Sequence, residues 1–510
     1  NLVDRLSTMG KMEEGRLTTL GLTATSRNIW CLELGGEDSD QRPAVAIVAG
    51  MDAHGLLGTE ISLRLAESLS KDKELLAQTT FYIIPLANPD IFVNDPNRLL
   101  WEKHTNDLSY DDDRDGKEDE DGYDDLNQDR IISMMRIRDV TGSWKPHPDD
   151  PRVMVKADPS KGEKGWYHLL TEGIDNDNDG KVNEDLPGGI NLNKNLTFDY
   201  VPFADGAGAY PASSIESRAL LDMLFEQWNV HTVISFSGIN NLNKAWKAQA
   251  PSPQSRIITQ VLPEDADVFQ WGVEAYKELI PQKDAPVSRP QGGEFATWAY
   301  FHYGRYSFST PGWWVPKVVA GENETRDIDN EMIRFLDWAE QQSREQKLWV
   351  DWTKIDHPDY PDQEVEVGGI VPYANTQPPI EMVDSIATDH LQFVKEVASM
   401  LPRLEIQNIK VEPLNGNLSR ITADIYNAGF LPTHSAMGNK IRWVRKPKLQ
   451  LILNSDEEQR LLSGPPVELQ QPIPGDGSKR FSWLVRGKGN LVLKVGSPIC
   501  GFAQEVISLR

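Results

Sequence analysis

Two acidic loops of equal length carry the clearest chemical pattern in this sequence. In each loop, aspartates occupy the first, third and fifth positions and a glycine occupies the sixth. These residues are Asp111, Asp113, Asp115 and Gly116 in the first loop, and Asp175, Asp177, Asp179 and Gly180 in the second. Oxygen ligands at alternate positions of a tight loop converge on one ion, and glycine permits the sharp turn. The pattern therefore predicts two calcium sites.

The later positions of both loops must complete the coordination, because Ca²⁺ takes about six to eight oxygen ligands. The backbone carbonyl of Lys117 or Lys181 would take the seventh position. At the twelfth position the usual helical calcium loop has a glutamate, but this chain has Gly122 or Leu186. Closure is expected from another late residue, and the sequence leaves open which one: Asp119, Glu120 or Asp121 in the first loop, and Asn183, Glu184 or Asp185 in the second.

A shorter acidic loop lies between these two and offers Asp125, Asn127 and Asp129. Arg130 stands where the glycine would be, so a third calcium site stays open. The alternative for all three loops is a flexible acidic segment without an ion. Acids are so dense between positions 107 and 129 that their repulsion would resist folding without a cation among them, which favours bound calcium.

The bulk composition describes an acidic globular protein of 510 residues, long enough for two or three domains. Its 77 acidic and 52 basic residues give a formal charge of -25, which disfavours nucleic acid and anionic lipid as partners. There is no apolar run long enough for a membrane span. The first residues lack a secretion-signal pattern, and nothing indicates an oligomeric state. For Cys31 and Cys500, two free buried thiols are favoured over one bridge.

The elements that must position these loops alternate between strand and helix in residues 1–402. Buried strands are expected over 44–49, 81–86 and 230–236, and helices over 59–69 and 214–228. This order predicts a largely parallel sheet flanked by helices, with acidic insertions at about 107–133 and 173–187. A helix over 379–400 leads into short alternating runs punctuated by Gly, Asn and Pro, which predict an antiparallel β-sandwich over 403–510.

Five motifs occur in the same order as in the zinc carboxypeptidase family, and the α/β part of the chain resembles that family. The motifs are the strand–turn–helix at Gly50–Glu60, the Asn-Pro-Asp turn at Asn88–Ile91, and the segments Asn191–Asn195, Ser213–Arg218 and Gly293–Thr310. The resemblance implies the family's mostly parallel mixed sheet. It also implies descent from a metallocarboxypeptidase-type hydrolase.

The resemblance further implies where the zinc and the catalytic base would lie, and these positions have changed. The three ligand positions fall on Asp52, Gly55 and Ser237, and the position of the catalytic glutamate falls on Pro311. Glycine has no side chain, serine is a poor zinc ligand, and proline cannot act as a general base. The chain is therefore expected to bind no zinc and to be a non-catalytic pseudopeptidase.

The resemblance places the substrate-binding pair on Asn193 and Lys194, so a peptide or another polar ligand is the expected occupant of the old cleft. An active metallocarboxypeptidase is the alternative, with zinc rearranged around Asp52 and His54 and a distant His104 or His302. A turn-stabilising hydrogen bond is the preferred role for His54, and no third ligand is identifiable.

Two further questions stay open in the sequence. The aromatic pairs at 300–301 and 313–314 could line a cleft, although aromatic clusters more often belong to the core, and His231 is expected to be structural. A calcium-stabilised surface or carbohydrate-binding protein that acts through the β-sandwich is the remaining alternative. Calcium loops of this kind favour a periplasmic or extracellular setting, where calcium is abundant.

Overall fold

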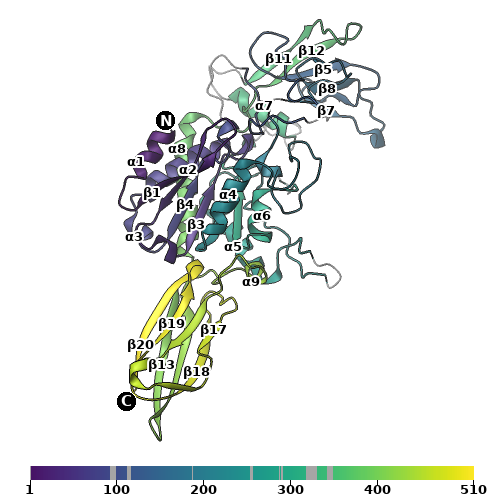
Figure 1. Cartoon of the computed structure of the whole chain (residues 1–510). Coiled ribbons are helices and arrows are strands. Elements are labelled where there is room, and N and C mark those ends of the chain that lie inside the picture. The colour runs from purple at the N-terminus through teal and green to yellow at the C-terminus, as the bar shows by residue number, and fades with distance from the viewer. Residues whose placement is uncertain are drawn as a thin grey trace.

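The computed structural model describes residues 2–91, 99–111, 116–186, 188–252, 257–285, 288, 291–317, 330–341 and 348–509. Three bodies follow one another in space: an antiparallel insertion, a central α/β domain and a C-terminal domain at the opposite end (Figure 1). Within the described ranges, no helix has the length and apolar character needed to cross a membrane.

A six-stranded mixed sheet forms the centre of the α/β domain, in the order β1-β2-β4-β3-β9-β10. Strands β4, β3, β9 and β10 run parallel, and β1 and β2 pair antiparallel at one edge. The strands are β1 Gly15–Leu22, β2 Asn28–Leu34, β3 Ala44–Val48, β4 Thr80–Ile84, β9 Val230–Phe236 and β10 Tyr306–Thr310. The predicted largely parallel sheet is confirmed.

Helices flank this sheet, and Ser214 starts one of them by accepting a hydrogen bond from the backbone of Ser217. The helices are α1 Leu2–Met9, α2 Leu56–Leu69, α3 Lys73–Leu76, α4 Ile215–Glu226, α5 Ala266–Leu279, α6 Phe295–Phe301, α7 Glu331–Gln341 and α8 Ile380–Ser399. The short 3₁₀ turns are η1 Ser39–Gln41, η2 Ala53–Gly55, η3 Pro89–Ile91, η4 Pro159–Lys161, η5 Leu192–Lys194, η6 Pro263–Asp265, η7 Ser455–Glu457 and η8 Pro498–Cys500.

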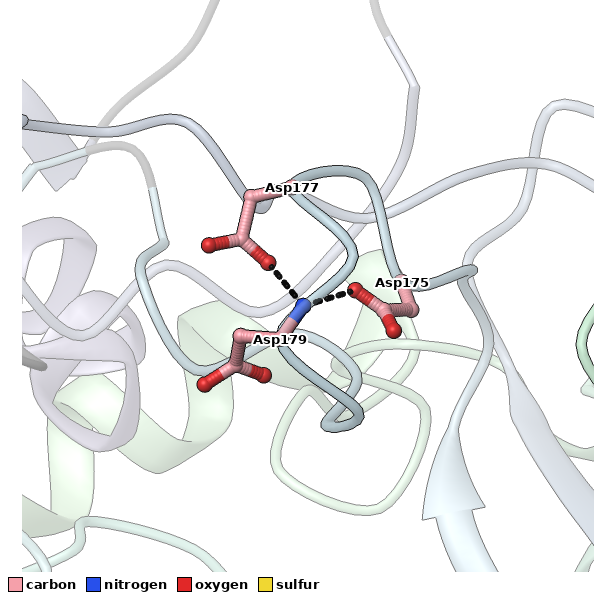
Figure 2. Close-up of side chains that lie close together, drawn as sticks. All are labelled: Asp175, Asp177 and Asp179. Carbon is pink, nitrogen blue, oxygen red and sulfur yellow. Dashed lines mark hydrogen bonds between the residues drawn. The ribbon is translucent and has the colours of Figure 1, made fainter.

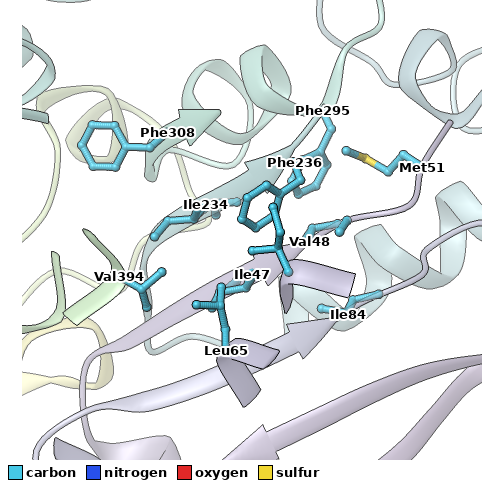
Figure 3. Close-up of a cluster of buried hydrophobic side chains, with 14 of the residues drawn as sticks. Ile47, Val48, Met51, Leu65, Ile84, Ile234, Phe236, Phe295, Phe308 and Val394 are labelled. Carbon is cyan, nitrogen blue, oxygen red and sulfur yellow. The ribbon is translucent and has the colours of Figure 1, made fainter. Parts of the chain in front are cut away.

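The central strands are apolar along their whole length because both of their faces are covered. Every residue of β3, β4 and β9 is buried. Figure 3 shows Ile47 of β3 and Ile234 of β9 with Leu65 of α2 and Val394 of α8, all in one core. This packing fixes the strand ends at which the candidate site lies.

An antiparallel sheet, not predicted as a separate unit, is inserted into the α/β domain in the order β11-β12-β5-β8-β6-β7. Its strands are β5 Met134–Arg138, β6 Trp144–Pro146, β7 Met154–Lys156, β8 Tyr167–Thr171, β11 Trp349–Ile355 and β12 Val365–Ile370. Its small core consists of Met135, Ile137, Val365 and Val367. The acidic loops precede β5 and follow β8, so they lie where the insertion leaves and rejoins the central domain.

Two four-stranded antiparallel sheets form the C-terminal domain, in the orders β13-β14-β18-β16 and β17-β15-β19-β20. Residues of both sheets share one apolar core, which includes Ile421, Trp483, Leu451 and Leu493. The elements are β13 Leu404–Leu414, β14 Leu418–Asn427, α9 Ala436–Lys440, β15 Lys448–Ile452, β16 Arg460–Ser463, β17 Val467–Leu469, β18 Ser478–Arg486, β19 Gly489–Ser497 and β20 Gly501–Leu509. Cys31 and Cys500 are free and buried in different cores, so the prediction of two free thiols is confirmed.

Buried polar groups join the C-terminal domain to the α/β domain. Asp265 accepts hydrogen bonds from Tyr300 Oη at 2.8 Å and Tyr306 Oη at 3.0 Å, and also from the backbone of Ala436 at 2.8 Å. His231, which was expected to be structural, has its Nε2 2.9 Å from the carbonyl of Pro432. The first domain thus binds the segment that enters α9.

We predict that acid weakens this junction. Burial lowers the pKa of His231 to about 3 and that of His434 to about 4. Both histidines bind protons in the unfolded chain below pH ~6.5 but stay neutral when folded. Each therefore lowers the free energy of unfolding by about 1.4 kcal/mol per pH unit as the pH falls from ~6.5 toward these values. Melting temperature measured against pH should show a shallower acid limb in His231→Gln than in the wild type. The exposed control His168→Gln should keep the wild-type slope, and parallel curves for His231→Gln would contradict the prediction.

Candidate functional site

A cleft of about 560 Å³ opens where the parallel strands β3, β9 and β10 end. The carboxyl ends of parallel strands meet at one edge of a sheet, so the loops that follow them share the lining of this cleft. Asp52 and His54 come from the loop after β3, Gly238 to Asn240 from the loop after β9, and Pro311 to Trp314 from the loop after β10.

The residues that the resemblance assigns to the zinc-ligand and catalytic-base positions lie together at these strand ends. Asp52 and Pro311 line the cleft. Ser237 is buried, its Oγ lies 3.0 Å from Ser309 Oγ, and it accepts the backbone N–H of Ile239 at 3.3 Å. Its hydroxyl is therefore engaged within the protein.

Gly55 occupies a space that has no room for a side chain. A Cβ atom there would lie 2.9 Å from the carbonyl oxygen of Phe236 and 3.2 Å from the backbone nitrogen of Gly50. The backbone of Gly55, at φ -90° and ψ 0°, is open to other residues, so the restriction is steric. A glutamate ligand at this position would require helix α2 and strand β9 to move apart.

Two histidines meet at the mouth of the cleft. The rings of His54 and His104 have centroids 4.8 Å apart, and His54 Nδ1 lies 3.8 Å from Asp52 Oδ1. His302 lies elsewhere, with its Nδ1 2.8 Å from Thr197 Oγ1. Among the described residues, the only three acids, histidines or cysteines close enough to share an ion are in the second acidic loop. His104, but not His302, therefore lies close to His54 and Asp52, where a rearranged zinc site was expected as the alternative.

Asn193 and Lys194 line the cleft, and both already have partners. Asn193 Oδ1 accepts the backbone N–H of Phe295 at 3.0 Å, at the start of α6. Lys194 Nζ donates to the carbonyl of Asp205 at 3.0 Å and lies 3.7 Å from Asp205 Oδ2. The charge of Lys194 is thus directed toward Asp205.

Glu294 is a cleft residue that sequence reasoning missed. It lies directly before α6, is 5% exposed, and lines the cleft with Asp52. Burial, together with the negative charge of Asp52, raises the pKa of Glu294 to about 8. In the sequence this glutamate follows two glycines and precedes an apolar segment, and that pattern could have marked it. The Trp313 and Trp314 pair lines the cleft, whereas the pair at 300–301 is in the core.

In the second acidic loop, two aspartate side chains accept hydrogen bonds from one backbone amide, which belongs to the third aspartate. The N–H of Asp179 donates to Asp175 Oδ1 at 3.1 Å and to Asp177 Oδ1 at 3.0 Å (Figure 2). The N–H of Gly180 donates to Asp175 Oδ2 at 2.9 Å. Carboxylate oxygens of the three aspartates lie within 4.8 Å of one another, which is compatible with a shared cation.

The third, shorter loop has the same hydrogen-bond pattern. The N–H of Asp129 donates to Asp125 Oδ1 at 3.1 Å and to Asn127 Oδ1 at 3.0 Å, and the N–H of Arg130 donates to Asp125 Oδ2 at 2.8 Å. Arg130 has φ 66°, close to the φ of 95° at Gly180, so it takes the left-handed conformation that glycine takes in the second loop.

Only part of the first acidic loop can be compared, because Asp113 and Asp115 lie outside the described residues. The N–H of Gly116 donates to Asp111 Oδ2 at 3.1 Å, as Gly180 does to Asp175. The N–H of Asp121 donates to the carbonyl of Asp185 at 3.2 Å, so the ends of the two long loops pair with each other.

Among the late residues of the second loop, Glu184 interacts with Asp179 of the aspartate cluster. Burial and the carboxylates of Asp121 and Asp179 raise the pKa of Glu184 to about 8. Asn183 Nδ2 instead donates to the carbonyl of Thr171 at 2.9 Å. Crowding of carboxylates around Glu184 makes it the best-placed residue to close this loop on an ion.

Comparison with known proteins matches two segments of the chain to family models. Residues 9–124 match the zinc carboxypeptidase model, and residues 403–508 match a domain of unknown function, DUF8731. Carboxypeptidase D from Mus musculus is 34% identical over 84 residues, and that from Homo sapiens is 33% identical over the same length. These matches cover 14% of this chain and 6% of the relatives, so the chain spans only a small part of them.

Solved structures similar to the chain include two carboxypeptidase-related proteins. Bovine thrombin-activatable fibrinolysis inhibitor, in complex with tick carboxypeptidase inhibitor, is 13% identical with a TM-score of 0.39, covering 78% of this chain and 94% of that one. Carboxypeptidase A from Helicoverpa armigera is 14% identical with a TM-score of 0.36, covering 66% and 69%. Identities and TM-scores this low support no statement about function. The match of residues 9–124 to the zinc carboxypeptidase model is more specific.

The steric restriction at Gly55 predicts a measurable difference between two glycines of the cleft region. Gly55→Ala should lower the free energy of unfolding by about 1–3 kcal/mol, because its Cβ would press on the carbonyl of Phe236. Gly238→Ala is the matched control, since a Cβ there would meet its nearest atom, in His54, at 3.6 Å, and its effect should stay within about 0.5 kcal/mol. Urea unfolding measures both, and equal stability of the two variants would refute the steric reading.

Proposed function

Because residues 9–124 belong to a zinc carboxypeptidase-like domain, we propose that this chain is a non-catalytic member of that family. In this proposal it binds calcium through its acidic loops and holds a peptide or another polar ligand in the old active-site cleft. The observation that carries the proposal is the packing around Gly55, which leaves no space for a ligand side chain at a position where the family has a zinc-binding glutamate.

The remaining positions support the same conclusion. Asp52 is the one zinc-ligand position whose side chain lines the cleft, and a single carboxylate does not hold a catalytic zinc. Without the ion there is no Lewis acid to activate water, and Pro311 offers no base. Hydrolysis by the family's route would therefore lack both of its chemical components.

Calcium in the acidic loops would stiffen the walls of the cleft. The N–H of Asn106, just before the first loop, donates to the carbonyl of Ile190 at 2.9 Å, and the N–H of Ile190 returns a bond to Asn106 Oδ1 at 3.1 Å. The two segments joined in this way also supply His104 and Asn191 to the cleft. Loops of this type suit a compartment with millimolar calcium, which favours a periplasmic or extracellular protein.

A rearranged metallohydrolase is the second candidate, and the proximity of His54, His104 and Asp52 favours it. Two imidazoles and a carboxylate are a common zinc ligand set. The separation of the rings by 4.8 Å and of His54 from Asp52 by 3.8 Å would have to close for one ion to bind all three. Metal content separates this candidate from the first.

Calcium removal should destabilise the protein. Bound calcium adds about 2.7 kcal/mol to the free energy of unfolding when its free concentration is roughly 100 times the Kd. EGTA should therefore lower the melting temperature by several degrees, and added calcium should restore it. The double variant Asp175→Asn/Asp177→Asn should lose part of this response, whereas Asp222→Asn, an exposed acid on α4, should keep all of it. A melting temperature that neither reagent changes would exclude calcium sites.

Zinc analysis should find far less than one zinc per chain after purification without chelators. Peptides with free C-termini should be recovered intact after prolonged incubation with the protein, because in this proposal both the zinc and the general base are missing. Asp52→Ala should change neither result. One zinc per chain that disappears in Asp52→Ala, with hydrolysis lost in parallel, would establish the metallohydrolase instead.

A further inference from the structure

Four side chains that line the cleft carry a buried polar atom without a hydrogen-bond partner in the described part of the chain. These atoms are Asp52 Oδ1, Asn240 Nδ2, Glu294 Oε2 and Trp313 Nε1. Buried polar atoms in native proteins are nearly always hydrogen-bonded, and each unmet one costs about 1–3 kcal/mol. Four around a single cleft indicate that the missing partners belong to a bound molecule.

Two of these atoms are acceptors on carboxylates that come from different elements. Asp52 follows β3 and is 4% exposed, and Glu294 precedes α6 and is 5% exposed. The nearest basic nitrogen to Asp52, Nδ1 of the half-exposed His54, is 3.8 Å away, beyond hydrogen-bond distance. Both carboxyl groups line the same cleft. Two acidic groups in one buried wall are stabilised by a proton or by a cation, and a bound cation favours the charged form of both.

No described lysine or arginine of the cleft supplies that charge. Lys194 is the only such residue in the described lining, and its ammonium is bonded to Asp205. The acids of the lining, by contrast, also include Asp205 and Glu331. Within the described lining, the two carboxyl groups thus lack a cationic partner, and a positively charged molecule that enters the cleft would supply one.

The other two atoms without a partner, Asn240 Nδ2 and Trp313 Nε1, are hydrogen-bond donors, so the bound molecule should also carry hydrogen-bond acceptors. Asn240 Oδ1 accepts the backbone N–H of Asn243 at 2.8 Å, so the amide is oriented with its NH₂ group left over. The indole N–H of Trp313 is buried with a side chain that is 2% exposed. Both would donate to oxygens such as carbonyls. The cleft thus combines two acceptors for a cation with two donors for neutral oxygens.

An organic ammonium group fits this arrangement better than a metal ion. The cleft, at about 560 Å³, is far larger than an ion, and no third described ligand completes a metal set there. An ammonium has N–H donors for both carboxylates, and such charge-assisted bonds are strong. We propose that Asp52 and Glu294 bind the ammonium of a small molecule whose oxygens are bound by Asn240 and Trp313. This inference rests on the proposed function, because it specifies the chemical class of the cleft's ligand.

The test uses glycylglycinamide, which has an ammonium and two carbonyls but no carboxylate, in calorimetric titrations of the full calcium-loaded chain at about pH 7. Glycylglycinamide should bind, and N-acetylglycylglycinamide, which lacks the charge, should bind at least about tenfold more weakly. Asp52→Asn and Glu294→Gln should each weaken binding by at least about tenfold. Glu331→Gln removes the same charge from an exposed position of the lining and should change the affinity less than about twofold. Melting curves confirm that each variant is folded.

The outcomes separate this inference from the proposed function. If the anion N-acetylglycylglycine binds and glycylglycinamide does not, the cleft still binds a polar ligand, but the ammonium site is wrong. If glycylglycinamide binds equally well to Asp52→Asn and Glu294→Gln, the ammonium site is wrong as well. If neither compound binds, both the ammonium site and the ligand-binding part of the proposed function are overturned. If Zn²⁺ alone binds stoichiometrically and is lost in Asp52→Asn, the carboxylates belong to a metal site.

Discussion

Helix α2 starts very close to the end of strand β9, so that residue 55 has no room for a side chain. The contact partner is the carbonyl oxygen of Phe236, at the end of β9, a strand that is buried along its whole length. Strand and helix are both packed into the main core, so neither can yield locally to make room. A single substitution at this position would therefore not recreate the family's ligand, and the proposal of a non-catalytic protein follows from packing as much as from residue type.

Two buried carboxyl groups set the charge of the cleft. In a zinc enzyme the metal balances the charge of the carboxylates near it. Here Asp52 and Glu294 are both buried in the lining of one cleft, whose described part holds no unengaged lysine or arginine. Lys194, the basic residue of the described lining, is bonded to Asp205. A positively charged ligand in place of the metal would restore the balance and also satisfy the unmet acceptors.

The acidic loops pose the same electrostatic problem at a second place in the molecule. In the second loop Asp175 and Asp177 accept hydrogen bonds from the same backbone amide, and the ends of the two long loops pair through Asp121 and Asp185. Such convergence of like charges is stable when a divalent cation sits among them. Because these loops connect the inserted sheet to the cleft walls, calcium there would act on the cleft through Asn106 and Ile190.

The sequence by itself determined the features that depend on local pattern: the buried parallel strands, the helices between them, the antiparallel C-terminal strands and the order of the carboxypeptidase motifs. It also located the acidic loops, since alternating aspartates followed by glycine shape their own backbone. Tertiary structure alone decided which distant residues meet. It placed Glu294 beside Asp52, brought His104 rather than His302 to His54, and directed Lys194 to Asp205. It also assembled the inserted sheet from segments near positions 134–171 and 349–370, whose short, half-exposed strands give a weak signal. These pairings join residues far apart in the chain, and only the packing of the whole domain selects them.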